Sequence, residues 1–252
     1  MALISIRDLE LSFGGIRALD HITADIPDHG ITGIIGPNGA GKTSLFNVIS
    51  GLYRPSGGSV HFAGRTIHSL PFYKVNRLGI ARTFQNLMVF DKLTVLQNVM
   101  IGFQSRSHAS LLDCVLRTRR AVREREQVAE RATALLELVG LDGHEADIAG
   151  GLPYGKQRQL DIARALATEP TVLLLDEPAA GLNRGERDNL KGILRRLAER
   201  GYVLCLIEHD MHFVMDLCHR IIVLNFGQLI AEGTPEQVQA DTNVRTAYLG
   251  EV

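Results

Sequence analysis

The sequence predicts an α/β protein in three parts: a core with a parallel sheet, an antiparallel β subdomain at the N-terminus and an inserted α-helical subdomain. Residues 3–26 alternate apolar and polar side chains around Gly14-Gly15, which is typical of hairpin strands. Later apolar runs carry no such alternation, as expected for parallel strands that helices cover on both faces. Residues 86–161 contain almost no strand signal and show helical spacing instead.

The core elements follow in order. ITGIIG (31–36) is an apolar strand that runs into a glycine-rich turn and then into a helix. On that helix Leu45, Val48, Ile49 and Leu52 are expected to share one face. The remaining strands are expected at residues 60–62, 171–176, 202–207 and 220–224.

The middle of the chain is predicted to be helical. RTRRAVREREQVAERATALLELVGL (117–141) has both the spacing and the propensity of a helix. Its arginine-rich part could contact lipid head groups or a partner, but interspersed glutamates favour a solvated face with pairs such as Arg120 with Glu124. We place the antiparallel subdomain and first part of the core at 1–85, the helical subdomain at 86–160, and the second part of the core with the C-terminal tail at 161–252.

Composition narrows the class of protein. With 252 residues and 45% hydrophobic content the chain can bury a large core. A net charge of −1 argues against a general nucleic-acid binder. No apolar run approaches the ~20 residues that span a bilayer. The cysteines Cys114, Cys205 and Cys218 lack metal-site spacing and two lie in apolar contexts, so a reducing cytosol is the simplest setting.

The glycine-rich turn matches the phosphate-binding pattern G-x-x-x-x-G-K-[ST] at every fixed position. Its glycines let backbone N–H groups wrap phosphates, and the following helix N-terminus adds positive potential. Lys42 can place a charge on the terminal phosphates, and the Thr43 hydroxyl suits Mg²⁺. We therefore expect a P-loop NTPase core whose nucleotide-binding residues are Gly36, Pro37, Asn38, Gly39, Ala40, Gly41, Lys42, Thr43 and Ser44.

Two acids, Asp176 and Glu177, end the apolar strand predicted at 171–176. Open α/β sheets bind ligands at such strand ends. Asp176 can hold Mg²⁺ through water, and Glu177 can polarise the attacking water as a general base. The alternative is a helix cap with two solvated acids ahead of Pro178, which the P-loop makes much less favourable.

These two motifs, in this order and separated by a helical insertion, resemble the ATPase subunit of ATP-binding-cassette (ABC) transporters over essentially the whole chain. The resemblance implies ATP and Mg²⁺ as cofactors. Gln85 in ARTFQNL is implied to sense the γ-phosphate beside the metal, and His209 in IEHDM to contact the γ-phosphate and hold the water. Phe13 is implied to stack on adenine, with core packing as its alternative. Asn183 falls in the D-loop, where aspartate is commoner, so it keeps hydrogen bonding but not charge.

The family's signature L-S-G-G-Q corresponds here to Leu152, Pro153, Tyr154, Gly155 and Lys156. A hydroxyl, one backbone N–H and a flexible glycine are therefore missing. The Gly155 N–H and the helix N-terminus remain, Lys156 could return positive charge, and Pro153 suits a first helical turn. In the family this segment covers the ATP of a neighbouring subunit. We hypothesise that the ATP site covered by this signature is weaker than the site that uses this chain's P-loop.

Within the family, four segments look like one ATPase of the branched-chain amino-acid importers: GLPYGKQRQLDIARAL, LLLDEPAAGLN, IEHDMHFVMDL and GTPEQVQADTNVRTAYLGE. The resemblance implies an ATP hydrolase coupled to transmembrane transport and peripheral to the cytoplasmic face of the inner (plasma) membrane. The implied partners are permease subunits, a second related ATPase in a head-to-tail dimer and, indirectly, an external solute-binding protein, with no nucleic acid.

Four other functions remain as alternatives for this sequence. The chain could serve a urea or amide importer, or a lipid or lipopolysaccharide exporter. A soluble ABC ATPase of DNA repair or ribosome action would usually carry a long coiled coil or two cassettes, which this sequence lacks. A GTPase-like switch is opposed by the Asp176-Glu177 pair, by the signature segment and by the lack of a guanine-reading Asn-Lys-x-Asp segment.

Overall fold

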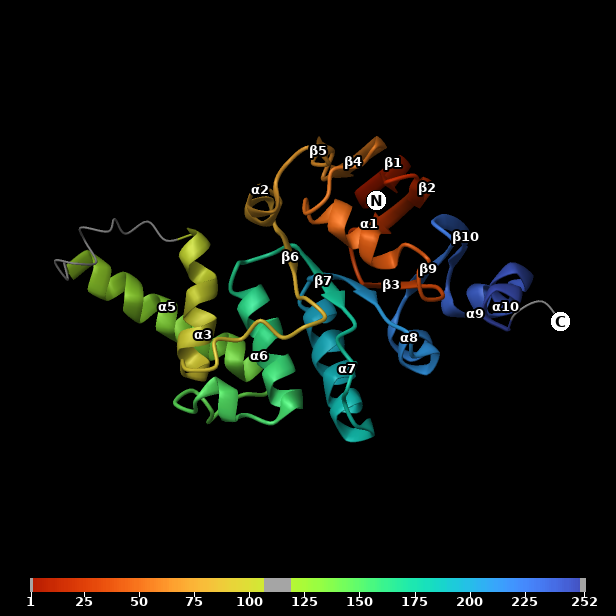
Figure 1. Ribbon diagram of the computed structural model, residues 1–252. Helices are drawn as coiled ribbons and strands as arrows, with labels where there is room; N and C mark the ends of the chain where they lie inside the picture. The colour runs from red at the N-terminus through yellow and green to blue at the C-terminus, as the bar shows by residue number, and fades with distance from the viewer. Residues whose placement is uncertain (1, 107–118, 250–252) are drawn as a thin grey trace. The chain divides into compact units, whose positions relative to one another are not determined.

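The protein divides into two compact units (Figure 1). The structure is a computed structural model that describes residues 2–106 and 119–249. The first unit, here called the core unit, comprises Met1–Gln85, Thr171–Gly181 and Leu194–Val252. The second, here called the helical unit, comprises Asn86–Pro170 and Leu182–Ile193. Helix α7 (Arg184–Glu199) therefore begins in the helical unit and ends in the core unit.

A six-stranded sheet in the order β10-β9-β3-β8-β7-β6 runs through the core unit (Figure 1). Neighbouring strands pair in parallel except β9 and β10, which are antiparallel. Every residue of β3, β7 and β8 is buried, which confirms the predicted parallel strands. The strands are β3 (Ile31–Ile35), β6 (Ile80–Arg82), β7 (Val172–Asp176), β8 (Val203–Ile207), β9 (Arg220–Asn225) and β10 (Gln228–Gly233).

Two strands of this sheet, β6 and β10, are not predicted from the sequence, and each has a physical reason. β6 is three residues long and ends in a charged arginine, so no apolar run marks it. β10 lies at the sheet edge, where its residues are mostly half-buried or exposed. Such a strand does not need the continuous apolar run of a central strand.

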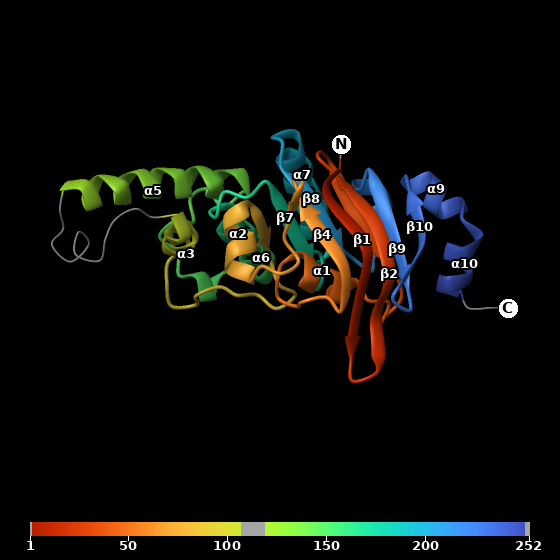
Figure 2. The same cartoon turned by 90° about the horizontal axis from the view of Figure 1, so that it is seen from above.

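A second, antiparallel sheet in the order β2-β1-β4-β5 completes the core unit, and Figure 2 shows β1, β2 and β4 side by side. Its strands are β1 (Ala2–Phe13), β2 (Ile16–Pro27), β4 (Gly57–Phe62) and β5 (Arg65–Thr66). The predicted hairpin is confirmed, and both turn residues, Gly14 and Gly15, have a positive φ. Apolar residues of both sheets and of α1 form one continuous buried cluster.

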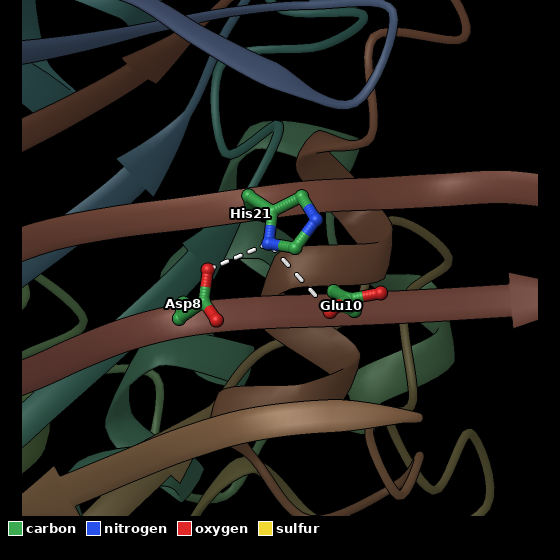
Figure 3. Close-up of side chains that lie close together, drawn as sticks. All are labelled: Asp8, Glu10 and His21. Atoms are coloured by element: carbon green, nitrogen blue, oxygen red, sulfur yellow. Dashed lines mark hydrogen bonds and ion pairs between the residues drawn. The ribbon is translucent and has the colours of Figure 1, made fainter.

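A bulge in the long β1–β2 ladder brings three titratable side chains together (Figure 3). Asp8 and His21 both have a positive φ, at 49° and 54°. His21 Nδ1 lies 2.6 Å from Asp8 Oδ1 and 3.6 Å from Glu10 Oε1. The hydrogen bond with Asp8 raises the pKa of His21, and the charge of Glu10 adds to the effect. Asp8 and His21 are exposed and Glu10 is half-buried, so the three side chains lie at the surface of the sheet.

The helices of the core unit are short. They are α1 (Lys42–Ile49), α2 (Phe72–Leu78), α8 (Met211–Leu217), α9 (Pro235–Ala240) and α10 (Thr242–Leu249). Leu45, Val48 and Ile49 lie on α1 and are all buried, which fits the predicted shared face. Leu52 lies beyond the end of α1 and is 42% exposed, so the prediction that it shares this face was wrong. The helix ends before Leu52 because Gly51 turns the chain with a φ of 77°.

The helical unit confirms the predicted α-helical insertion. Its helices are α3 (Val95–Gly102), the 3-10 turn η1 (Phe103–Arg106), α5 (Arg119–Leu138), the 3-10 turn η2 (Ala149–Gly151) and α6 (Tyr154–Leu166). Thr94 caps α3 through a reciprocal bond with Gln97. The first residues of the predicted helix at 117–141, and Cys114, lie outside the described residues. Cys205 and Cys218, in the core unit, are both buried.

Candidate active site

The glycine-rich loop lies between β3 and α1, and two of its glycines are required by close packing. Gly36 follows β3 with a φ of 152°, and a Cβ there would come within 2.1 Å of the Leu224 carbonyl oxygen in β9. Gly41 precedes α1 with a φ of 99°, and a Cβ there would lie 2.6 Å from the Ala18 carbonyl oxygen in β2. A side chain at either position would meet backbone that cannot move away. The path of the loop is therefore set by contact with β2 and β9.

The start of α1 is suited to hold an anion. Within the described part of the chain no side chain caps this helix, so its first backbone N–H groups have no intrahelical or side-chain acceptor. Lys42 is buried and donates from Nζ to the carbonyl oxygens of Gly36, at 2.6 Å, and Pro37, at 2.9 Å. Burial lowers the pKa of Lys42, while the charges of Glu177 and Asp176 oppose that change. Backbone donors and a nearby ammonium are the groups that bind phosphates.

Glu177 is held on both sides by the two residues that sequence reasoning grouped with it. Gln85 Nε2 donates to Glu177 Oε2 at 2.9 Å, and His209 Nε2 lies 2.7 Å from Glu177 Oε1. The Glu177 backbone has a φ of 48°, which is rare for a residue with a side chain. Strained backbone of this kind persists where the surrounding structure fixes it, often at functional sites. The structure therefore brings Gln85, Glu177 and His209 together.

Asp176 and Thr43 supply oxygen atoms of the kind that Mg²⁺ prefers. Asp176 is the last residue of β7 and is 4% exposed. Thr43 lies in the first turn of α1 and is exposed. A carboxylate at a strand end and a hydroxyl at the start of the P-loop helix are the donor set that P-loop NTPases use for this ion.

Two charged residues that sequence reasoning missed support these groups. Arg82, at the end of β6, forms a buried ion pair with Asp176, with 2.7 Å between Nη2 and Oδ2. Glu208, which precedes His209, accepts backbone N–H bonds from Ala179 at 2.6 Å and from His209 at 3.3 Å. Burial raises the pKa of Glu208. For Glu208 the available signal is a charged residue directly after the apolar run of β8, because a buried charge must be paired. Arg82 carries no such signal, since β6 is too short to form an apolar run.

Phe13 lies at the end of β1 beside an aromatic partner that the sequence analysis did not name. Its ring centroid is 5.3 Å from that of Tyr53, and the two rings meet edge to face. Both side chains are more than 40% exposed, with Phe13 at 45% and Tyr53 at 41%. The alternative of core packing for Phe13 is therefore wrong, and its ring is accessible to a planar ligand.

The segment Leu152–Lys156 forms the start of α6 in the helical unit. Pro153 is the N-cap residue of α6, one position before the first helical turn for which it was expected, and Tyr154 is 44% exposed. Lys156 Nζ lies 2.5 Å from His144 Nε2, and His144 Nδ1 lies 2.6 Å from Asp147 Oδ2. The Lys156 charge is thus held within a Lys–His–Asp chain of the same unit.

Gly155 and Asn183 meet through one glutamate of α7. A Cβ at Gly155 would lie 2.6 Å from Glu186 Oε1, so a larger residue would displace that carboxylate. Glu186 Oε2 accepts from the Asn183 N–H at 2.9 Å, and Asn183 Oδ1 accepts from the Glu186 N–H at 3.0 Å. This reciprocal bonding is a capping box at the start of α7. The Asn183 side chain therefore caps the N-terminus of α7.

A P-loop and an acid pair at a strand end of the same parallel sheet define a nucleoside-triphosphate hydrolase of the P-loop class. Comparison with known proteins gives the family. The sequence profile of the ABC transporter family matches residues 19–180, and that of the branched-chain amino acid ATP-binding cassette transporters matches residues 228–252. The chain therefore belongs to the ABC transporter family, and it is of the ATP-binding and ATP-hydrolysing kind.

Two similar proteins and one solved structure span nearly the whole chain. The high-affinity branched-chain amino acid transport ATP-binding protein BraF of Pseudomonas aeruginosa is 39% identical, over 99% of this chain and 98% of its own length. The corresponding protein LivG of Escherichia coli (strain K12) is also 39% identical, with the same coverage. The ADP conformation of an ATP-binding cassette of an ABC transporter superposes with a TM-score of 0.87 at 32% identity, over the full length of both chains.

Among the described residues, no helix combines the length and apolar character that crossing a membrane requires.

Proposed function

We propose that this chain is the ATP-hydrolysing subunit that powers an importer of branched-chain or related hydrophobic amino acids. The observation that carries the ATPase part is the Glu177 carboxylate, which Gln85 and His209 hold beside Asp176. The assignment of the solute is supported by two findings. Residues 228–252 match the profile of branched-chain amino acid ATP-binding cassette transporters, and the chain is similar to BraF and LivG.

In the proposed reaction, Glu177 polarises the water that attacks the γ-phosphate. Each Glu177 oxygen already has one partner, but a carboxylate oxygen has two acceptor sites, so either can still accept a proton from water. His209 and Gln85 hold the carboxylate in place, and we assign both residues to contact the γ-phosphate. The fixed geometry avoids reorganisation during the reaction.

The nucleotide is assigned to the exposed Phe13 ring and to the loop Gly36–Ser44, with Lys42 exchanging its carbonyl partners for phosphate oxygens. We assign Mg²⁺ to Thr43, Asp176 and Gln85, whose oxygen atoms suit a hard cation. When bound, the ion neutralises charge on the β- and γ-phosphate oxygens.

A second, related ATPase subunit is proposed to complete each site. In a head-to-tail dimer, Leu152–Lys156 of this chain would cover the ATP of its partner, and Asn183 would lie at the junction of the two subunits. ATP would join the subunits and hydrolysis would release them. Permease subunits would bind the ATPase pair at the cytoplasmic face of the membrane, and an external solute-binding protein would deliver the solute.

Replacing Glu177 by glutamine tests the catalytic assignment. We expect Glu177→Gln to lower the ATPase turnover by at least about 100-fold, because the general base is lost, while ATP binding stays intact. Phosphate release and equilibrium binding of a fluorescent ATP analogue measure the two properties. Glu199→Gln, exposed at the end of α7, is the matched control and should retain full activity. Full turnover in Glu177→Gln would contradict the assignment.

Reconstitution of the transporter in liposomes tests which solute it transports. The full chain, assembled with its candidate permease subunits, second ATPase and binding protein in liposomes, should take up labelled leucine, isoleucine or valine when ATP is supplied. Uptake of urea or short amides without amino-acid uptake would show that the chain serves a urea or amide importer. ATP-dependent extraction of lipid or lipopolysaccharide without amino-acid uptake would contradict the proposed import.

A further inference from the structure

We propose that Arg82 is a positioning residue that fixes the Asp176 carboxylate and joins it to the far end of the P-loop helix, so that the response to Mg²⁺ depends on Arg82. The inference rests on the proposed ATPase function. Arg82 lies at the end of β6, shortly before Gln85 in the chain, and β6 pairs in parallel with β7, the strand that ends in Asp176.

The two halves of the Arg82 guanidinium have different partners. Nη2 lies 2.7 Å from Asp176 Oδ2, and the two side chains are only 2% and 6% exposed. Nη1 donates to Asn47 Oδ1 at 2.7 Å and to Ser50 Oγ at 3.2 Å. Asn47 lies in α1 and Ser50 is its C-cap. One side chain therefore connects the proposed metal-side carboxylate to the helix that begins at the P-loop.

The surroundings of Arg82 keep the guanidinium in one place. The C-terminal end of α1 carries partial negative charge, which favours a cation. The rings of Phe46 and Phe84 lie on the guanidinium at 5.5 and 5.2 Å between the guanidinium carbon and the ring centroids. Because the planar fork of arginine makes bonds in two directions, its rotation is restricted and so is that of Asp176.

Stability alone does not explain this ion pair. Burying two charges costs desolvation, and well-packed apolar residues of similar volume often serve a core equally well. The acid of the pair is the residue proposed to bind Mg²⁺, and residues that orient a metal ligand commonly change metal affinity when they are replaced. The pair is therefore better explained as support for a ligand than as a contribution to the core.

Two variants separate charge from geometry. Arg82→Lys keeps the positive charge but cannot bond Asp176 and Asn47 at once, because an ammonium on a single stem lacks the arginine fork. Arg82→Met keeps an unbranched apolar stem and removes the charge. Arg195→Met is the matched control, since Arg195 pairs with Asp216 at 2.9 Å on the exposed surface of the core unit.

The experiment measures binding of a fluorescent ATP analogue to the full chain, first in EDTA and then over a Mg²⁺ titration. We expect both Arg82 variants to bind the analogue in EDTA almost as the wild type does. Their Mg²⁺ midpoint should rise by about 10- to 100-fold, while Arg195→Met keeps the wild-type midpoint. If the Arg82→Met variant does not fold, Arg82→Lys alone decides the question.

A double variant shows whether Arg82 acts through Asp176. In an Asp176→Asn background, Arg82→Met should change the Mg²⁺ response no further, because interacting residues are not additive. Asp176→Asn should also raise the melting temperature of Arg82→Met, since it removes a buried carboxylate left without its partner.

The outcomes are distinguishable. An unchanged Mg²⁺ midpoint, an equal loss of binding with and without Mg²⁺, or additive effects in the double variant would each overturn the inference and leave Arg82 a structural residue. A wild-type chain that binds no ATP analogue under any condition would overturn the proposed function, and this inference with it.

Discussion

Two neighbouring glutamates show how environment separates chemically identical residues. Glu177 is partly exposed, has a left-handed backbone and pairs with the side chains of Gln85 and His209. Glu208 is 4% exposed and accepts only backbone N–H bonds, from Ala179 and His209, among those the structure describes. The first can contact a reactant, whereas the second links the segment after β7 to the segment after β8. Position in the fold, and not residue type, decides which glutamate is available for chemistry.

Asp161 gives a prediction at the same scale, because it is a buried acid whose ionisation opposes folding. It lies on α6, and burial raises its pKa from 3.8 to about 6, although Arg164 and Arg158 act in the opposite direction. Its Oδ2 atom has no hydrogen-bond partner within the described residues. Folding therefore shifts the protonation equilibrium of Asp161 toward the neutral acid, compared with the unfolded chain. The contribution of Asp161 to stability is greatest below pH 3.8 and is lost as the pH rises through about 6.

Replacing Asp161 by asparagine should remove this pH dependence. The difference between the two pKa values corresponds to about 3 kcal/mol, so Asp161→Asn should be more stable than the wild type at neutral pH by up to that amount. Urea unfolding followed by circular dichroism at several pH values measures the effect. Asp188→Asn, on the exposed surface of α7, is a control that should keep the wild-type pH profile. Identical pH profiles for Asp161→Asn and the wild type would contradict the prediction.

At the scale of elements, the β1–β2 hairpin contains a pH-sensitive contact (Figure 3). The hydrogen bond to Asp8, then the charges of Glu10, Asp8 and Asp20, raise the pKa of His21 above its ordinary value of 6.5. Protonated His21 therefore stabilises the folded hairpin. That contribution is fully present below pH 6.5 and is lost as the pH rises through the higher folded-state value.

His21→Asn should consequently lower the melting temperature at a pH below 6.5 and have little effect at alkaline pH. The loss should be small, because the groups are solvent-exposed and exposed ion pairs contribute little. Thermal unfolding at both pH values measures it, and His29→Asn, an exposed histidine after β2, is the comparison. A loss that is larger at alkaline pH would show that the sign is wrong.

The start of α6 shows how an element can differ from a sequence expectation. Lys156 was expected to return positive charge to the altered signature, and its ammonium instead lies against His144, whose other nitrogen lies against Asp147. Local contacts in the helical unit therefore hold this charge. The remaining donors of the segment are the Gly155 N–H and the N-terminus of α6.

At the scale of the whole molecule, the altered signature predicts two unequal ATP sites in a dimer with a second ATPase. The missing serine removes a hydrogen bond to phosphate, which should weaken the site covered by this chain by roughly tenfold or more. Lys42→Ala removes the stronger site, so it should lower the ATPase activity more than the matching change in the partner. Nucleotide trapping in the assembled transporter compares the two variants. Equal residual activities would refute the inequality.

The sequence by itself determined the class of the fold and the location of its phosphate site. Continuous apolar runs specify buried parallel strands, and the glycine pattern before Lys42 specifies a phosphate-binding turn, because both signals are local in the chain. The family resemblance added Gln85, His209, Phe13, Asn183 and the signature segment. These assignments needed no knowledge of distances.

Only the tertiary structure decided which charged residues support that site. Arg82 meets Asp176 and Asn47 across β6, β7 and α1, and Glu208 meets the backbone of Ala179. Leu52 leaves the core because Gly51 ends α1 one turn earlier than the apolar spacing indicates. Pairing between residues far apart in the chain depends on how strands align and on which side chains are buried together. Neither property is expressed in the local order of amino acids.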